Sequence, residues 1–90
     1  MNLLFITLVK FRKKPTKEML AEVQRFRNWV NEQGGKILGS YWTLGRYDMV
    51  TISDCPDEKS HMKAMLKIAD LVSTETLAAV TAEEAGKLVE

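Results

Sequence analysis

The sequence predicts an α+β fold with the element order β-α-β-β-α-β, followed by a short closing helix. Three observations lead to this prediction: an apolar, β-branched segment at residues 3–9, a helical apolar repeat after it, and two strand-like segments that meet around Gly45. The length of 90 residues predicts one small domain spanning residues 1–90. A chain of this size buries only about 60 to 65% of the surface that its unfolded form exposes, so its core is thin.

Composition restricts how such a thin core can be reinforced. With 46% apolar and 28% charged residues the chain is globular, and small domains often add a disulfide, a metal or self-association. Cys55 is the only cysteine and His61 the only histidine, which excludes an internal disulfide and the usual Cys/His zinc sites. We therefore predict no metal, no cofactor and self-association into a homodimer or a larger homo-oligomer.

The charge distribution is uneven although the net charge is only +1, which argues against a general polyanion binder. Residues 1–46 hold nine Lys/Arg and three Asp/Glu, whereas residues 47–90 hold four and nine. Five basic residues fall within a short stretch that we call the basic loop: Lys10, Arg12, Lys13, Lys14 and Lys17. It is either an ordinary solvated loop or a surface for an acidic partner.

The apolar start of the chain is too short to span a bilayer, and positive charges follow it instead of preceding it. With one free thiol and no such segment, the sequence predicts a cytoplasmic protein without a membrane partner. The RNP sequence patterns of sheet-type RNA-binding domains are absent, which predicts no nucleic-acid partner.

The first strand is apolar on both faces. Alternate residues lie on opposite sides of a strand, so one side carries Leu3, Phe5, Thr7, Val9 and Phe11, and the other carries Leu4, Ile6 and Leu8. A lone sheet with helices on one face needs only one apolar side, so a second layer must cover the other side of this strand.

A first helix follows, with Thr16 as its N-cap and Gly34-Gly35 as its stop. Its buried stripe consists of residues at spacings of four, three and four: Met19, Val23, Phe26 and Val30. Two strands then occupy 36–43 and 48–53, and the short connection between them makes an antiparallel hairpin.

A second helix begins at Pro56 and Asp57, and its expected inward face consists of Met62, Met65, Leu66 and Ala69. Residues 71–80 form the last strand, and Thr81 to Glu84 match a capping box that opens the closing helix. With right-handed crossovers this order is the ferredoxin-like arrangement, a four-stranded antiparallel sheet with both long helices on one face. The other face stays open.

The hairpin carries the string Gly45-Arg46-Tyr47-Asp48, which fits the pattern G-x-Y-D and is followed by the strand "MVTIS". Together with "ITLVKF" before it and "STETLAAVT" after it, this resembles the GYD domain family, small proteins of the dimeric α/β-barrel superfamily. The resemblance implies dimerisation through the open sheet face. A similar hairpin in the effector-binding domains of Lrp/AsnC-type regulators implies that a small molecule could be sensed.

Two interpretations of the hairpin remain open. Gly45 and Asp48 suit a tight turn, because glycine adopts positive φ and aspartate accepts backbone N–H groups. Alternatively, Tyr47 and Asp48 are donor and acceptor at the mouth of a pocket with Tyr41 and Trp42 as walls. Hydroxyls on the strands could line a semi-polar cavity or reflect only the β-propensity of threonine; they belong to Thr51, Ser53, Thr74 and Thr76.

Histidine, methionine and cysteine side chains give weaker signals. The resemblance extends to haem-handling relatives that use a helical histidine, but His61 has no supporting pattern and we predict no haem. Met62 and Met65 suit core packing better than a metal site. Cys55 is expected to be a surface or half-buried thiol without a role.

The sequence thus predicts a domain that dimerises and binds a small organic ligand at Tyr41, Trp42, Tyr47, Asp48, Thr51, Thr74 and Thr76, with no catalytic residue assigned. Two alternatives stay open. One is a cofactor-independent isomerase or monooxygenase, as the superfamily resemblance implies, with Tyr47 or Asp48 in acid-base work. The other is a protein-interaction module that uses the basic loop at residues 10–17.

Overall fold

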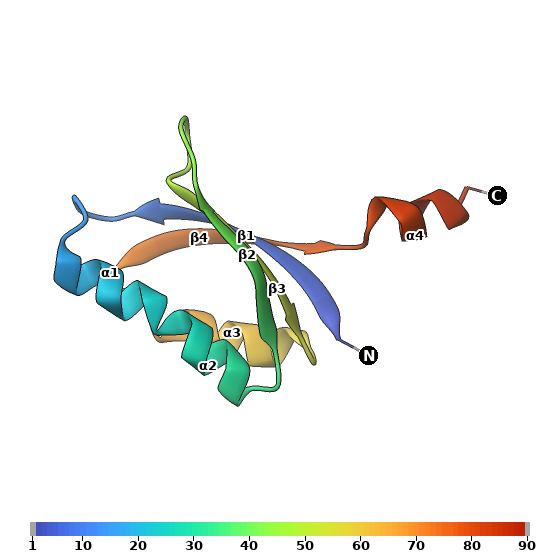
Figure 1. Cartoon of the computed structure of the whole chain (residues 1–90), viewed down its shortest axis with the longest axis horizontal. Helices are drawn as coiled ribbons and strands as arrows, with labels where there is room; N and C mark the ends of the chain where they lie inside the picture. Colours follow the sequence, from blue (N-terminus) through green and yellow to red (C-terminus); the bar gives the residue numbers. More distant parts are fainter. Residues whose placement is uncertain (1, 90) are drawn as a thin grey trace.

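A computed structural model describes residues 2–89 and contains one four-stranded antiparallel sheet with the strand order β2-β3-β1-β4 (Figure 1). The predicted fold class is confirmed. The elements run in the order β1 (Leu3–Phe11), α1 (Lys17–Gln24), α2 (Phe26–Glu32), β2 (Lys36–Trp42), β3 (Met49–Cys55), α3 (Glu58–Leu66), β4 (Val72–Ala79) and α4 (Ala82–Lys87).

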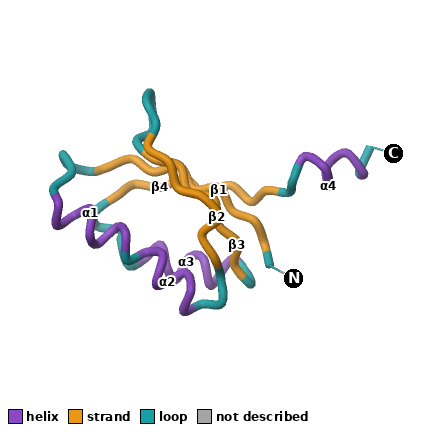
Figure 2. Tube along the Cα trace, viewed as in Figure 1, coloured by secondary structure: helices purple, strands orange, loops and turns teal. Residues whose placement is uncertain are grey.

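The helices α1, α2 and α3 lie on one side of the sheet, whereas the tip of the β2-β3 hairpin points away from them (Figure 2). The first predicted helix is interrupted at Arg25, which separates α1 from α2. Thr16 caps α1 as expected, because its hydroxyl accepts the backbone N–H of Met19. Gly34 adopts φ +83° directly after α2, which ends the helix in the predicted way.

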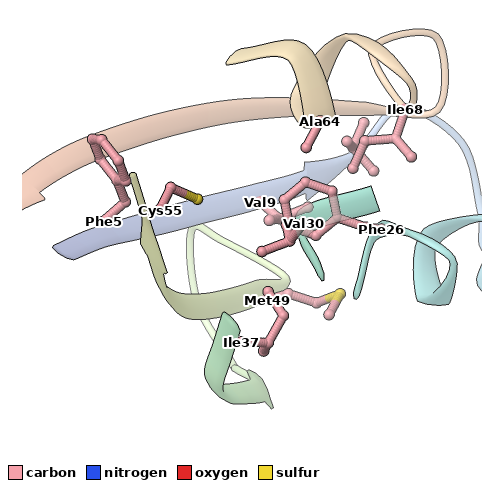
Figure 3. Packing of buried hydrophobic residues seen from close by; sticks show 10 residues of the cluster. Phe5, Val9, Phe26, Val30, Ile37, Met49, Cys55, Ala64 and Ile68 are labelled. Carbon is pink, nitrogen blue, oxygen red and sulfur yellow. The ribbon is translucent and has the colours of Figure 1, made fainter. Parts of the chain in front are cut away.

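The core lies between the sheet and these three helices (Figure 3). Phe5 and Val9 point into it from β1, and Phe26 and Val30 point into it from α2. The alternate residues of β1, Leu4, Ile6 and Leu8, are only half-buried. The two faces of β1 therefore differ as the pattern predicted, with one covered by helices and the other open.

The inward face of α3 corrects the expectation from the sequence. His61, Ala64 and Ile68 are buried, whereas Met62 and Leu66 are 59% and 70% exposed. Met65 packs against the core as expected. The buried His61 and Ile68, however, lie one position before the predicted Met62 and Ala69. Both sets of residues have helical spacing. The apolar pattern favoured the set with Met62 and Leu66, because the other set includes the polar residue His61.

The last helix lies apart from the rest of the fold. α4 extends away from the sheet and its helices, and none of its residues is buried (Figure 1). Its N-cap is nevertheless formed as predicted, because the Thr81 hydroxyl accepts the backbone N–H of Glu84. Among residues 2–89, no helix has the length and apolar character needed to cross a membrane. The cytoplasmic location remains a prediction.

Candidate ligand-binding site

A row of hydroxyl groups crosses the helix-facing side of the sheet. Consecutive cross-strand partners place one hydroxyl on every strand: Ser40 on β2 opposite Thr51 on β3, Thr51 opposite Thr7 on β1, and Thr7 opposite Thr76 on β4. We call these four residues the hydroxyl row. Since the two side faces of a strand alternate, all four groups lie on the side where the helices pack.

Hydrogen bonds join the row in two pairs. The Oγ atoms of Ser40 and Thr51 are 3.4 Å apart, and those of Thr7 and Thr76 are also 3.4 Å apart. His61 reaches the second pair from α3, with its Nε2 atom 3.3 Å from the Thr7 hydroxyl and 3.2 Å from the Thr76 hydroxyl. One imidazole therefore ties α3 to both β1 and β4.

His61 is almost fully buried in aromatic surroundings. Its ring stacks on Phe5 with centroids 4.6 Å apart and meets the edge of Phe26 at 6.3 Å. Its Nδ1 atom is 3.9 Å from the Cys55 thiol. Burial lowers the pKa of His61, because the charged imidazolium would lose its hydration. The histidine is therefore neutral at pH 7 and can accept a hydrogen bond at one nitrogen while donating at the other.

A cavity of about 420 Å³ opens between the hydroxyl row and the helices. Three members of the row, Thr7, Ser40 and Thr51, lie on its wall, and Gln24 and Arg27 line it from the helical side. The remaining wall is apolar and consists of Val9, Val23, Phe26, Ile37, Met49, Met65 and Ile68. Several of these side chains converge from the sheet and the helices in Figure 3. A volume of this size is typical of sites for small organic ligands.

The hairpin that suggested a site from the sequence is attached to the neighbouring strand by hydrogen bonds. Asp48 accepts the backbone N–H of Phe11 at 2.8 Å through its carboxylate and donates its own N–H to the Val9 carbonyl. Lys10 donates from Nζ to the carbonyl of Arg46. Gly45 has φ +101°, as expected for the turn. These contacts hold the hairpin in register with β1.

The aromatic residues of the hairpin end lie near the surface. Tyr47 donates its hydroxyl to the Glu75 carboxylate at 2.6 Å, and this hydrogen bond raises the pKa of the phenol. The Arg46 guanidinium lies 5.5 Å from the centre of the Tyr47 ring. Tyr41 is 58% exposed, and Trp42 is 60% exposed beside Phe11.

The predicted site residues therefore fall in different places. Thr51 lines the cavity and Thr76 contacts His61 next to it. Thr74 lies instead in a smaller pocket of about 250 Å³ with residues of α3. The lining of the large cavity includes neither of the hairpin tyrosines, nor Trp42, nor Asp48.

Sequence reasoning missed two hydroxyls of the row, Thr7 and Ser40, and also Arg27. The one available signal was Thr7, a single hydroxyl inside the otherwise apolar segment "LLFITLV". Cys55 is fully buried, which corrects the expectation of a surface or half-buried thiol. Within residues 2–89, no three His, Cys, Asp or Glu side chains lie close enough to hold a metal ion.

The sequence model of the GYD domain family matches residues 5–89, which is most of the chain. The chain belongs to the GYD domain family. The resemblance to this family, predicted from the G-x-Y-D string together with the segments before and after it, is thereby confirmed. In this structure Asp48 of that string attaches the hairpin to β1. No protein of curated function matches the chain.

Solved structures similar to this GYD domain show the same fold. The cofactor-independent oxygenase SnoaB from Streptomyces nogalater, in a mutant form, has a TM-score of 0.59 at 14% identity, covering 90% of this chain and 93% of that one. A dimeric ferredoxin-like protein of unknown function from Bacteroides fragilis has a TM-score of 0.53 at 14% identity, covering 89% and 96%. MtbAldR has a TM-score of 0.59 at 10% identity, covering 90% of this chain, which spans only 55% of MtbAldR.

Proposed function

We propose that this GYD domain is a homodimer that binds a small organic ligand in the cavity beside the hydroxyl row. The observation that carries the binding function is the cavity of about 420 Å³ itself, with an apolar wall and three hydroxyls on one side. Such a combination suits recognition of a small molecule, because apolar contact supplies affinity and a few polar groups fix orientation.

Dimerisation is supported by the open face of the sheet. Its centre is apolar, since Ile6 pairs with Ile52 on one side and with Leu77 on the other. Leu77 is 44% exposed in the single chain. A contiguous apolar centre surrounded by polar residues such as Glu75 is the usual anatomy of an interface between subunits. The dimeric Bacteroides fragilis protein of similar fold is consistent with this arrangement.

Sedimentation velocity tests the dimer. The unmodified chain should sediment as two copies, and Leu77→Lys should give monomers because the interface would bury an unpaired ammonium group. Leu66→Lys is the matched control, since Leu66 is an exposed leucine on α3, outside the sheet. A monomeric unmodified chain at micromolar concentration would contradict the dimer.

Binding in the cavity can be tested with N-phenylnaphthylamine, a neutral dye whose fluorescence rises in apolar sites. Ser40→Phe places a ring in the cavity from the edge strand β2, and we expect it to weaken dye binding about tenfold or more. Thr74→Phe is the matched control on the other edge strand, outside this cavity. Circular dichroism checks that both variants fold. Equal binding by the unmodified chain and Ser40→Phe would overturn the proposal.

The other predicted functions remain predictions. Ligand binding by Tyr41, Trp42, Tyr47, Asp48 and Thr74 has no support from the lining of the large cavity. An enzyme that uses Tyr47 or Asp48 would have to free these groups from Glu75 and Phe11. The likeness to SnoaB is at 14% identity and concerns the fold alone.

Some basic residues of the basic loop form hydrogen bonds within the domain and are therefore less available to another protein. Lys10 donates to the Arg46 carbonyl and Arg12 donates to the Ala69 carbonyl, so two of its five basic residues already bind the domain itself. Lys13 and Lys14 are exposed. A protein-interaction role would depend on these two and on Lys17, which is also exposed, so neutralising Lys13 and Lys14 should weaken capture of an acidic partner.

A further inference from the structure

The polar groups around the cavity are of two kinds, and they lie in different elements. The hydroxyls of Thr7, Ser40 and Thr51 come from the sheet and carry no charge. Gln24 and Arg27 come from α1 and α2, and both are exposed residues of the cavity lining. A ligand in the cavity would therefore meet neutral hydroxyls on the sheet side and a guanidinium on the helix side.

Arg27 supplies the only formal charge among the cavity-lining residues that the structure describes. No carboxylate is among these residues, and the one ion pair within residues 2–89 joins Arg25 to Glu22. The Arg27 guanidinium is thus not committed to an acidic side chain in the described part of the chain. It retains five N–H donors in a planar arrangement that matches a carboxylate.

We propose that the ligand of this cavity is a small amphiphilic anion, such as an organic carboxylate, whose charged group pairs with Arg27. This inference rests on the proposed binding function and adds the chemical class of the ligand. The apolar part would lie against side chains such as Phe26, Met49 and Met65. A cation would be repelled by Arg27, whereas a neutral molecule would leave the guanidinium hydrated and gain nothing from it.

The size of the effect follows from the exposure of Arg27. A solvent-exposed pair is weakened by water and salt, so the contribution of Arg27 should be modest and should decrease with ionic strength. A charge-assisted hydrogen bond of this kind should change affinity by about three- to tenfold. The prediction therefore concerns discrimination between an anion and a neutral molecule of the same shape.

Two dyes with the same aromatic skeleton provide this comparison. Anilinonaphthalene sulfonate carries one negative charge, and N-phenylnaphthylamine lacks it. Arg27→Gln should weaken binding of the anionic dye about three- to tenfold and leave the neutral dye unchanged. Arg25→Gln is the matched control, because it removes the same charge two residues away, from a side chain that pairs with Glu22 and does not line the cavity. It should affect neither dye.

The outcomes separate this inference from the function on which it rests. If Ser40→Phe weakens both dyes but Arg27→Gln affects neither, or affects both equally, the cavity binds small molecules and the anionic class is wrong. If Arg25→Gln weakens the anionic dye as much as Arg27→Gln does, the effect is one of general charge and the inference also fails. If Ser40→Phe leaves both dyes bound, the cavity is not the site and the proposed function fails first.

Discussion

The Asp48 carboxylate accepts a hydrogen bond from the backbone N–H of Phe11, with 2.8 Å between Oδ2 and N. This contact joins the last residue of the G-x-Y-D string to the end of β1. The pairing of β1 with β3 ends at Val9 and Met49, so β3 offers no backbone acceptor to the partly buried N–H of Phe11. The Asp48 carboxylate supplies that acceptor. The aspartate thus has a structural task in this domain.

Asp48→Ala should therefore lower the free energy of unfolding by about 1 to 2 kcal/mol, since the Phe11 N–H would lose its acceptor. Asp48→Asn, which keeps an acceptor oxygen, should lose less. Urea unfolding monitored by circular dichroism measures both. We expect neither variant to change N-phenylnaphthylamine binding. If Asp48→Ala weakens the dye as strongly as Ser40→Phe does, Asp48 belongs to the ligand site after all.

His61 should make stability depend on pH. Its pKa in the folded chain is lowered from 6.5 by burial, so in mildly acidic solution the unfolded chain binds the proton more readily than the folded one. The contribution of His61 to the free energy of unfolding is fully present above 6.5, the pKa of histidine in the unfolded chain. It is lost as the pH falls from 6.5 toward the lower pKa of the folded chain.

Urea unfolding at several pH values between about 7.5 and 5 measures this effect. In the variant His61→Leu, the fall in unfolding free energy over this range should be smaller than in the unmodified chain. The comparison uses the slope with pH and not the absolute stability, because the substitution also removes the hydrogen bonds to Thr7 and Thr76. Parallel pH profiles for the two proteins would contradict the prediction.

Gly35 should tolerate no side chain. An added Cβ would lie 2.5 Å from the Asp54 carbonyl oxygen and 2.9 Å from Cγ1 of Val30. Gly35→Ala should therefore destabilise the fold by about 2 kcal/mol or more, since the backbone of β3 would have to move. Gly86→Ala is the matched control in α4, where an added Cβ meets nothing within 4 Å, and it should not destabilise the fold, because alanine favours a helix by up to about 1 kcal/mol over glycine. Similar midpoints in urea for the two variants would argue against this packing.

The Cys55 thiol should be slow to react in the folded protein. It is fully buried, and burial raises its pKa, so little reactive thiolate is present. Labelling with dithionitrobenzoate should be much slower in native buffer than in urea. Rapid labelling in native buffer, at the rate seen in urea, would mean that the segment around Cys55 opens readily.

Local signals in the sequence predicted the elements well. Thr16 and Thr81 were expected as helix N-caps and both accept the predicted type of backbone hydrogen bond. Gly45 was expected at positive φ in the hairpin and has it. These features depend on a few neighbouring residues, so the chain carries them without reference to the rest of the fold.

Apart from Met65, the inward face of α3 was predicted wrongly, because two sets of residues with helical spacing overlap there. Met62 and Leu66 are apolar and suit burial, yet the helix presents His61 and Ala64 to the core. A polar residue can be buried when partners lie opposite it, and the partners of His61 are hydroxyls on β1 and β4. These hydroxyls belong to residues far from His61 in the sequence, so the residues around His61 do not predict them.

By itself, the sequence determined the element order, the helix caps, the hairpin and the two-sided apolar character of β1, since all of these follow from spacing and side-chain type over a few residues. Only the tertiary structure decided that Ser40, Thr51, Thr7 and Thr76 form one row and that Arg27 faces the cavity beside it. The physical reason is strand register. Pairing sets which residues of distant strands become neighbours, and a shift by one residue would turn each hydroxyl to the opposite face of the sheet.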